Sequence, residues 1–222
     1  AKDLAILSNE VGADFIQIST DQVFDGEKRF YTELDVPRPI NKYGLTKWHG
    51  EQEVLRCKKD ALVLRTNFFG WGPPHRLSLS DWILNGLYHG TIIDAYTDSF
   101  FTPIYIKILI KTAHKLVKEG AHGLFNVVGN ERLSKYEFAL KVCETFSLDK
   151  RLVQRGSLKR AITVIPGKVQ RPLDMSLSNR KLASTIDCND FSLDSMLAEL
   201  VADEHQMRSE KLKYVDCSSM GE

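Results

Sequence analysis

The stretch DFIQISTDQVFDG, residues 14–26, joins an apolar strand pattern directly to polar side chains. Its apolar part, FIQI, is typical of a buried strand, and Ser19, Thr20 and Asp21 follow it without an intervening turn. The middle of a sheet disfavours such groups, whereas the carboxyl edge of an open α/β sheet is where ligands bind. The stretch therefore predicts a strand that ends at a binding site.

The segments around this strand give a helix, strand, helix, strand order. Residues 1–13 have the spacing of an amphipathic helix, residues 43–57 carry helix formers, and residues 61–70, ALVLRTNFFG, are mostly apolar. One face of the first helix carries Leu4, Ala5, Leu7 and Val11. An apolar run such as ALVLRT is typical of a parallel strand buried on both faces. The order predicts an α/β fold built on a doubly wound, Rossmann-like parallel sheet.

A second region begins at Pro73 and Pro74, which interrupt regular structure. Beyond them the pattern predicts helices over 77–90, 102–120 and 134–146 and a strand over 123–129. In the helix over 102–120 the side chains expected to point inward are Ile106, Leu109, Ile110, Ala113, Leu116 and Val117. Ser134 followed by Glu137 matches a capping box at a helix start.

The composition excludes several classes of protein. The 222 residues, 43% of them hydrophobic, can bury a core, and a net charge of +1 gives no reason to expect nucleic acid or an anionic membrane as partner. The four cysteines lack Cys-x-x-Cys spacing and no His-Glu-x-x-His occurs, so neither a disulfide framework nor a metal site is expected. We expect a cytoplasmic protein. A chain that begins at Ala1, inside a helix pattern, also suggests a fragment or a processed product.

Tyr43 and Lys47 lie four residues apart at the start of the second helix, so both project from one face. Surface helices produce such pairs by chance, but this pair follows a strand edge that carries Thr20. A phenol with a nearby ammonium can deliver a proton near neutral pH, and the ammonium can also bond the ribose of a nicotinamide nucleotide. With Thr20 donating to a substrate carbonyl oxygen, the three residues suit hydride transfer.

Several motifs in the same order resemble the dTDP-4-dehydrorhamnose reductase family of extended short-chain dehydrogenases. They are STDQVFDG (19–26), YTELDVPRPINKYGLTKWHGE (31–51), LVLRTNFFG (62–70), DSFFTPIYI (98–106), GLFNVVGNERLSKYEFA (123–139) and QRPLDMSLSNRKL (170–182). The resemblance covers about residues 1–186. It implies reduction of a 4-keto nucleotide sugar with NADPH or NADH.

The resemblance also assigns roles to residues. The catalytic set would be Thr20, Tyr43 and Lys47. The residues against the cofactor would be Tyr43, Lys47, Thr66 and Asn67, and those against the substrate would be Asp21, Gln22, Phe68 and Arg171. Other interpretations stay open, because Phe68 could be a core residue, Arg171 a surface ion pair and Asn67 a turn cap.

The same resemblance predicts three parts along the chain. Residues 1–72 would be the carboxyl-terminal portion of a Rossmann-like NAD(P)-binding domain that carries the catalytic residues. Residues 73–186 would be mainly substrate-binding, and residues 187–222 a helical tail. The tail is amphipathic over 194–216 and would pack on the domain or on a second subunit.

One family feature is missing from the sequence. A dinucleotide-binding domain opens with a strand, a glycine-rich turn and a helix, and no glycine-rich loop precedes Thr20. The chain is then either part of a nucleotide-sugar reductase, inactive by itself, or a non-catalytic binding or regulatory protein like the β subunit of methionine adenosyltransferase. The Thr-Tyr-Lys set favours the first hypothesis and the missing loop the second. Uncovered strand edges would favour a homodimer or a partner protein in either case.

Overall fold

The computed structural model describes residues 1–73, 76–164 and 169–204. It is a mixed α/β structure with parallel strands, which confirms the predicted fold class. The helix expected over 194–216 is present over 193–204, and the rest of that segment lies outside the described residues.

The elements follow in chain order. The helices are α1 (Lys2–Glu10), α2 (Lys42–Cys57), α3 (Leu79–Tyr88), α4 (Ile106–Lys118), α5 (Lys135–Thr145), α6 (Leu158–Val164) and α7 (Arg180–Thr185). The strands are β1 (Ile16–Ile18), β2 (Leu62–Arg65), β3 (Phe68–Phe69), β4 (Ile93–Tyr96), β5 (Phe100–Phe101), β6 (Ile104–Tyr105), β7 (Gly123–Asn126), β8 (Leu133–Ser134) and β9 (Val153–Gly156). Short 3-10 helices cover η1 (Asp21–Val23), η2 (Lys150–Leu152) and η3 (Asn189–Phe191).

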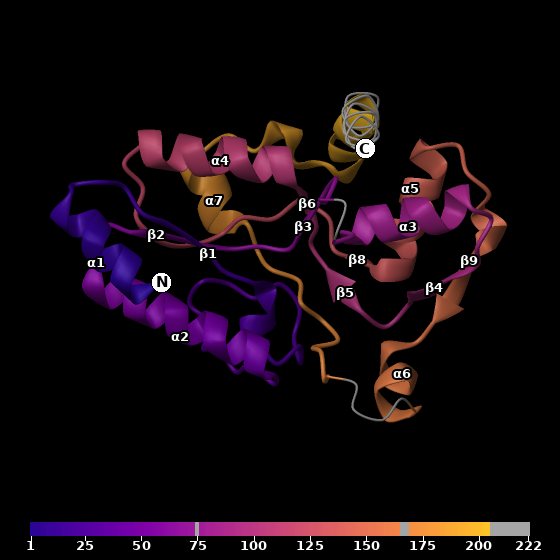
Figure 1. Ribbon diagram of the computed structural model, residues 1–222, viewed down its shortest axis with the longest axis horizontal. Helices are drawn as coiled ribbons and strands as arrows, with labels where there is room; N and C mark the ends of the chain where they lie inside the picture. The colour runs from indigo at the N-terminus through magenta and orange to yellow at the C-terminus, as the bar shows by residue number, and fades with distance from the viewer. Residues whose placement is uncertain (74–75, 165–168, 205–222) are drawn as a thin grey trace, which may run out of the picture.

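The larger part of the molecule is a parallel sheet between two layers of helices. Its strand order is β1-β2-β7, with Val63 of β2 opposite Gln17 on one side and Leu124 on the other. Helices α1 and α2 lie on one face and α4 and α7 on the other (Figure 1). Every residue of the central strand β2 is buried, as expected for a parallel strand covered on both faces. The carboxyl ends of the three strands meet at one edge of the sheet.

A smaller region lies beside this edge and contains α3, α5, α6 and two small sheets (Figure 1). Strand β4 pairs in parallel with β9, and β5 pairs antiparallel with β8. The predicted capping box is confirmed: Ser134 Oγ accepts a hydrogen bond from Glu137 N, and the Glu137 carboxylate accepts one from Ser134 N. This cap fixes the start of α5 next to β8. The three-part division of the chain stays a prediction.

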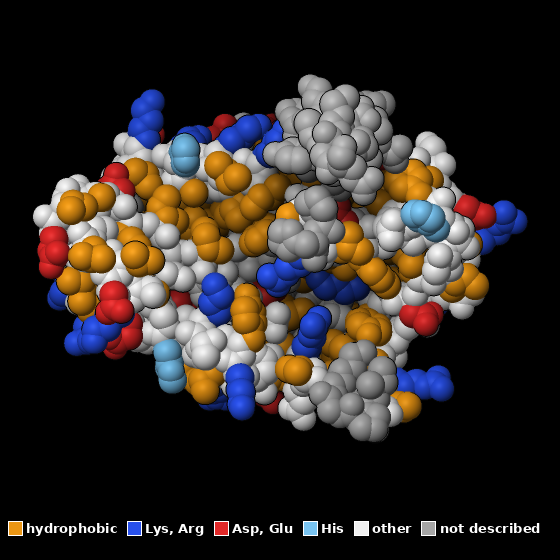
Figure 2. Space-filling model, in the orientation of Figure 1, with side chains coloured by type: hydrophobic (Ala, Val, Ile, Leu, Met, Phe, Trp, Pro, Cys, Tyr) orange, Lys and Arg blue, Asp and Glu red, His pale blue; other side chains and the backbone are white. Residues whose placement is uncertain are grey.

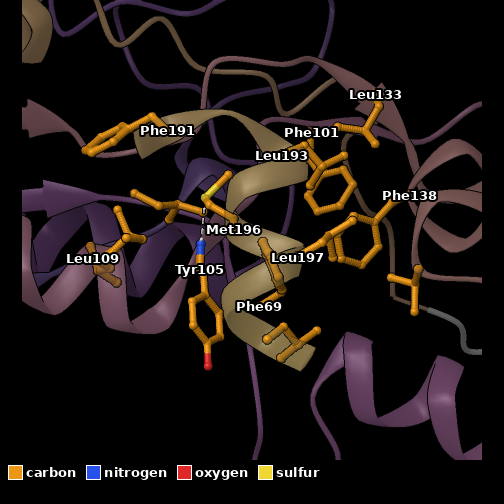
Figure 3. Packing of buried hydrophobic residues seen from close by; sticks show 14 of the residues in the cluster. Phe69, Phe101, Tyr105, Leu109, Leu133, Phe138, Phe191, Leu193, Met196 and Leu197 are labelled. Atoms are coloured by element: carbon orange, nitrogen blue, oxygen red, sulfur yellow. Dashed lines mark hydrogen bonds between the residues drawn. The ribbon is translucent and has the colours of Figure 1, made fainter. Parts of the chain in front are cut away.

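The helix over 193–204 packs into the main hydrophobic core. Its buried side chains are Leu193, Met196, Leu197 and Leu200. They lie against aromatic residues of the smaller region, and Tyr105 N donates a hydrogen bond to Met196 Sδ at 3.2 Å (Figure 3). This described part of the tail therefore packs on its own domain.

Two expectations about helix faces were wrong. Ile110 is 51% exposed, and the buried side chains of α4 are Ile108, Leu109, Thr112, Ala113 and Leu116. On α1, only Ala5 and Ser8 are buried. The other apolar members of the expected face, Leu4, Leu7 and Val11, are exposed. Figure 2 shows hydrophobic side chains at the surface in the part of the molecule where α1 and the sheet lie in Figure 1.

Candidate functional site

The strand β1 ends where the polar side chains begin. Thr20 has an extended backbone and caps η1, with its Oγ1 accepting a hydrogen bond from Gln22 N at 3.3 Å. The Thr20 hydroxyl donates to Asp21 Oδ1 at 3.1 Å. Both side chains are buried. The local hydrogen bonds of Thr20 and Asp21 thus turn the chain away from the sheet at its carboxyl edge.

Helix α2 starts against this turn. Asn41 caps the helix by accepting a hydrogen bond from Gly44 N at 2.8 Å, and its Nδ2 donates to Gln22 Oε1 at 3.2 Å. At Gly44 an added Cβ would lie 2.1 Å from the Gln22 carbonyl oxygen. Only glycine therefore allows the first turn of α2 to approach η1 this closely.

This approach brings the three predicted catalytic residues to one place. Lys47 Nζ donates a hydrogen bond to the carbonyl oxygen of Ile18, the last residue of β1, at 3.1 Å. The same ammonium lies 6.0 Å from the centroid of the Tyr43 ring, and Tyr43 is exposed. Thr20 follows Ile18 by two residues. Lys47 thus connects the Tyr43 ring with the carboxyl end of β1, which Thr20 closely follows, and the catalytic roles of the three residues stay predictions.

The end of β2 contributes a second group of side chains. Asn67 Nδ2 donates a hydrogen bond to Asp21 Oδ2 across the sheet edge, so Asn67 is not a turn cap. Thr66 Oγ1 is buried and has no hydrogen-bond partner among the described residues. Phe69 is 1% exposed, whereas Phe68 is 50% exposed, so the interpretation of Phe68 as a core residue was wrong.

A cavity of about 380 Å³ opens beside this edge, between the sheet and the smaller region. Its polar lining consists of Gln22, Asn67, Asp94, Tyr96, Ser99, Lys135 and Arg171, and its apolar lining of Leu79, Trp82, Ile83, Ala95, Leu158 and Met175. The structure thus brings three of the predicted residues, Gln22, Asn67 and Arg171, into one cavity. Asp21 lies behind Asn67 and does not line it. Arg171 forms no ion pair within the described chain.

Lys135 is a cavity residue that the sequence did not single out. Its ammonium lies 3.0 Å from the centroid of the Phe101 ring. Burial lowers the pKa of Lys135 to about 7; the charge of Arg171 also lowers this pKa, and the charge of Asp21 raises it. Burial raises the pKa of the Asp21 carboxyl to about 6, against hydrogen bonds from Asn67 and Thr20 and the charge of Lys135, which lower it. Only the position of Lys135 directly after the capping residue Ser134 was visible in the sequence.

A second cluster of polar groups lies on the interior side of the same strand ends. Arg65 donates to both carboxylate oxygens of Glu51, at 3.0 Å from Nε and 2.7 Å from Nη2. Ser19 Oγ also donates to Glu51. The Arg65 guanidinium lies 5.0 Å from the Phe24 ring centroid. We call Ser19, Glu51 and Arg65 the buried network; it connects β1, α2 and β2 immediately behind the candidate site.

Metal, membrane and disulfide features can be addressed for the described part of the chain. There, no group of three His, Cys, Asp or Glu side chains is placed to hold a metal ion. No helix within residues 1–73, 76–164 and 169–204 is long and apolar enough to cross a membrane. Cys57, Cys143 and Cys188 are free thiols.

Comparison with known proteins places this geometry in a family. The family model of the RmlD substrate binding domain matches residues 1–206. The chain belongs to this family. The resemblance predicted from the motifs is thereby confirmed. A probable low-salt glycan biosynthesis reductase, Agl14 of Haloferax volcanii, is 30% identical over 204 residues, which are 90% of this chain and 67% of that protein.

Another group of similar proteins is named as a subunit and not as a reductase. Methionine adenosyltransferase 2 subunit beta of Xenopus laevis is 32% identical to this RmlD-family chain over 193 residues, 82% of the chain and 55% of the subunit. The chain thus spans between about half and two thirds of the length of these relatives.

Solved structures of reductases have the same fold as this chain. A dTDP-4-dehydrorhamnose reductase ortholog from Clostridium acetobutylicum superposes with a TM-score of 0.81 at 28% identity, covering 90% of this chain and 69% of that one. The dTDP-4-dehydrorhamnose reductase from Bacillus anthracis, in complex with NADP, gives a TM-score of 0.82 at 24% identity, covering 91% and 70%. The RmlD-family chain is thus related to sugar reductases in sequence and in fold.

Proposed function

We propose that this chain carries the catalytic and substrate-binding part of an NAD(P)H-dependent reductase of a 4-keto nucleotide sugar. The observation that supports the proposal is the position of Lys47, which bonds the carboxyl end of β1 two residues before Thr20 and lies beside the Tyr43 ring. Three residue types that suit carbonyl reduction come together there from two elements. The names of similar proteins, which include reductases, support the same conclusion.

Each member of the set has a distinct part in the reaction. Tyr43 donates a proton to the substrate oxygen, because its phenol is exposed where a carbonyl could approach. Lys47, held on the Ile18 carbonyl, stabilises the phenolate that this step leaves. Thr20 turns its hydroxyl from Asp21 toward the same oxygen and orients it. Gln22 lies where it can contact the sugar from the cavity wall.

The donor set also fits the nicotinamide end of a dinucleotide. Lys47 makes one hydrogen bond within the described chain, so its other N–H groups can bind ribose hydroxyls. Thr66 Oγ1, buried without a partner, is a further polar group on the same edge. When bound, the cofactor supplies the hydride. The side chains of this chain orient the carbonyl and provide the proton.

A second candidate function is that of a non-catalytic binding or regulatory subunit. The similarity to methionine adenosyltransferase 2 subunit beta supports it, together with the exposed apolar side chains of α1, which a partner protein could cover. A subunit of this kind needs no turnover by the Thr-Tyr-Lys set. Assay of reduction therefore distinguishes the two functions.

The test uses the protein as its own cells produce it, with NADPH or NADH and dTDP-4-dehydrorhamnose, the 4-keto nucleotide sugar in the name of the similar reductases. We expect reduction by the wild type and a loss of about 10²- to 10⁴-fold in kcat for Tyr43→Phe, with cofactor affinity unchanged. Tyr88→Phe is the matched control, because Tyr88 is similarly exposed on α3 and does not line the cavity.

Two outcomes would count against this function. Equal turnover by wild type and Tyr43→Phe would remove Tyr43 from the mechanism. No reduction of any 4-keto nucleotide sugar by the intact protein would favour the binding subunit instead.

A further inference from the structure

The wall of the cavity carries two positive charges that lack a carboxylate partner. Lys135 and Arg171 both line the cavity, and among the described residues neither has an Asp or Glu oxygen within 4.0 Å. Nearby Arg132 contrasts with them, because it pairs with Asp174 at 2.5 Å. Cations that face a cavity unpaired are the groups that an anionic ligand can engage.

The local structure holds Lys135 in place before any ligand arrives. Lys135 is the first residue of α5, after the capping residue Ser134, and its N–H donates to the Ser99 carbonyl at 2.9 Å. Pairing of β5 with β8 sets the Phe101 ring beneath the ammonium. A cation on an aromatic face keeps its charge available to other partners. The Lys135 side chain then loses little conformational entropy when a ligand binds.

Arg171, which also lines the cavity, is positioned by its neighbours in the chain. The Gln170 carbonyl accepts a hydrogen bond from Asn41 Nδ2 at 3.0 Å, which ties this segment to the start of α2. Pro172 packs against Gly26, where an added Cβ would come within 2.6 Å of the proline ring. Arg171 itself is exposed and free of ion pairs within the described chain, so its guanidinium can turn toward the cavity.

The remaining charged groups near Lys135 do not neutralise it. Asp21 acts from η1 but lies behind Asn67, and its own pKa is raised by burial. Asp94 of β4 is exposed and lines the same cavity, as does Tyr96, and Asp94 forms no ion pair with Lys135. Figure 2 shows Lys and Arg side chains near the middle of the face that it presents.

We propose that Lys135 is a binding residue for the diphosphate of a nucleotide sugar and that it acts together with Arg171, which lines the same cavity. The inference rests on the proposed function, because it concerns the substrate of the same site. The ammonium donates charge-assisted hydrogen bonds to phosphate oxygens, and the guanidinium can engage them in a bidentate manner. Recognition of the diphosphate then distinguishes a nucleotide sugar from a free sugar of the same stereochemistry.

The test measures binding to the intact protein without turnover. The probes are dTDP-glucose and UDP-glucose, which carry no keto group and whose diphosphate charge is constant near neutral pH, with thymidine and uridine as uncharged counterparts. The variants are Lys135→Met, Lys135→Arg and, as a control on the same helix, Lys141→Met. Lys141 is exposed and pairs with Asp194 at 2.9 Å, away from the cavity.

We expect Lys135→Met to weaken binding of a nucleotide sugar by about 10- to 100-fold and to leave the nucleoside unaffected. Lys135→Arg should restore most of the affinity, and Lys141→Met should bind like the wild type. Because burial lowers the pKa of Lys135 to about 7, wild-type affinity should fall between pH 6.5 and 8.5, while Lys135→Arg should stay constant. A Lys135→Met variant with the wild-type ratio of nucleotide-sugar to nucleoside affinity would overturn the proposal.

The results that would reject this inference differ from those that would reject the proposed function. Binding of dTDP-glucose or UDP-glucose that depends on Lys135, without any reduction, would support the binding site and reject the reductase. Reduction with an unchanged KM in Lys135→Met would support the reductase and reject the role of Lys135.

Discussion

Two positive charges lie near the carboxyl ends of the sheet strands in opposite surroundings. Arg65, 2% exposed at the end of β2, makes two hydrogen bonds to Glu51, which is fully buried. Lys135, at the cavity wall, has an aromatic ring beneath it and no carboxylate within ion-pair distance in the described chain. Both lose hydration, but only Arg65 is in direct contact with a carboxylate, whereas Asp21 acts on Lys135 from beyond ion-pair distance.

The difference separates a charged residue that stabilises the fold from one that can bind a ligand. The buried ion pair between Arg65 and Glu51 connects α2 with β2, and Ser19 of the chain after β1 adds a third hydrogen bond to the same carboxylate. An unpaired cation in a cavity raises the free energy of the empty protein and is compensated only when an anion binds. The following changes test that contrast, from the largest expected effect to the smallest.

Removal of the carboxylate from the buried network should cost the most. In Glu51→Ala, Arg65 keeps its charge without a partner, so we expect a loss of about 3–5 kcal/mol in the free energy of unfolding. Chemical denaturation measures this loss in the free energy of unfolding. Glu53→Ala is the matched control on the same helix, because Glu53 is exposed and should change stability by less than about 1 kcal/mol. Equal effects of the two substitutions would contradict the structural role of the network.

Replacement of both partners should recover much of that loss. In the double variant Glu51→Leu with Arg65→Met, no unpaired charge remains and the side chains fill similar volume. We expect it to lie within about 2 kcal/mol of the wild type, with some cost because Ser19 loses its acceptor. A double variant as unstable as Glu51→Ala would show that packing, and not the uncompensated charge, dominates the network.

The pH dependence of stability should distinguish Asp21 from a carboxylate in an ion pair. Burial raises its folded-state pKa from 3.8 to about 6, so the folded protein binds the proton more tightly than the unfolded chain. Its contribution to stability is therefore present below about pH 4 and is lost as pH rises to about 6. Lys135 stays protonated in both states over this window.

The side chain at position 21 cannot ionise in Asp21→Asn, so the stability of this variant lacks the decline between pH 4 and pH 6. The stability of the variant relative to the wild type should rise by on the order of 1–2 kcal/mol between pH 4 and pH 6. Denaturation midpoints of both proteins across this range measure it. A relative stability that falls with rising pH would mean that Lys135 pairs with Asp21 as Arg65 pairs with Glu51.

The smallest effect concerns the cap that holds Lys135 at the start of α5. Ser134→Ala removes the acceptor for Glu137 N and should cost about 1 kcal/mol of stability. Ser184→Ala is the control, because the exposed Ser184 hydroxyl bonds only a carbonyl of its own helix and its loss should be nearly neutral. Thermal unfolding compares the two. A neutral Ser134→Ala would show that packing alone positions Lys135.

The sequence predicted what depends on local pattern. The order of α1, β1, α2 and β2 follows from hydrophobic periodicity, and the Ser134–Glu137 capping box follows from spacing. That β1 ends just before Ser19 and Thr20 could be read from these polar residues, because such side chains are disfavoured in a buried strand.

The rest depends on contacts between distant segments. Nothing near Lys135 in the chain indicates that Phe101, 34 positions earlier, lies beneath its ammonium. The bond from Asn67 to Asp21 requires the ends of two strands to meet, and the exposure of Leu4, Leu7 and Val11 depends on what covers α1. Ile110 was misassigned because helical periodicity leaves the edge of a buried face undetermined.

The measurement that tests the proposed reductase most directly follows the hydride itself. NADPH or NADH carrying deuterium at one face of nicotinamide C4 would be supplied to the intact protein with dTDP-4-dehydrorhamnose, and the product examined by mass spectrometry and NMR. We predict one deuterium on the former carbonyl carbon from one of the two labelled faces, and none above background with Tyr43→Phe. A product without deuterium at that carbon, or no product with either cofactor, would contradict the account.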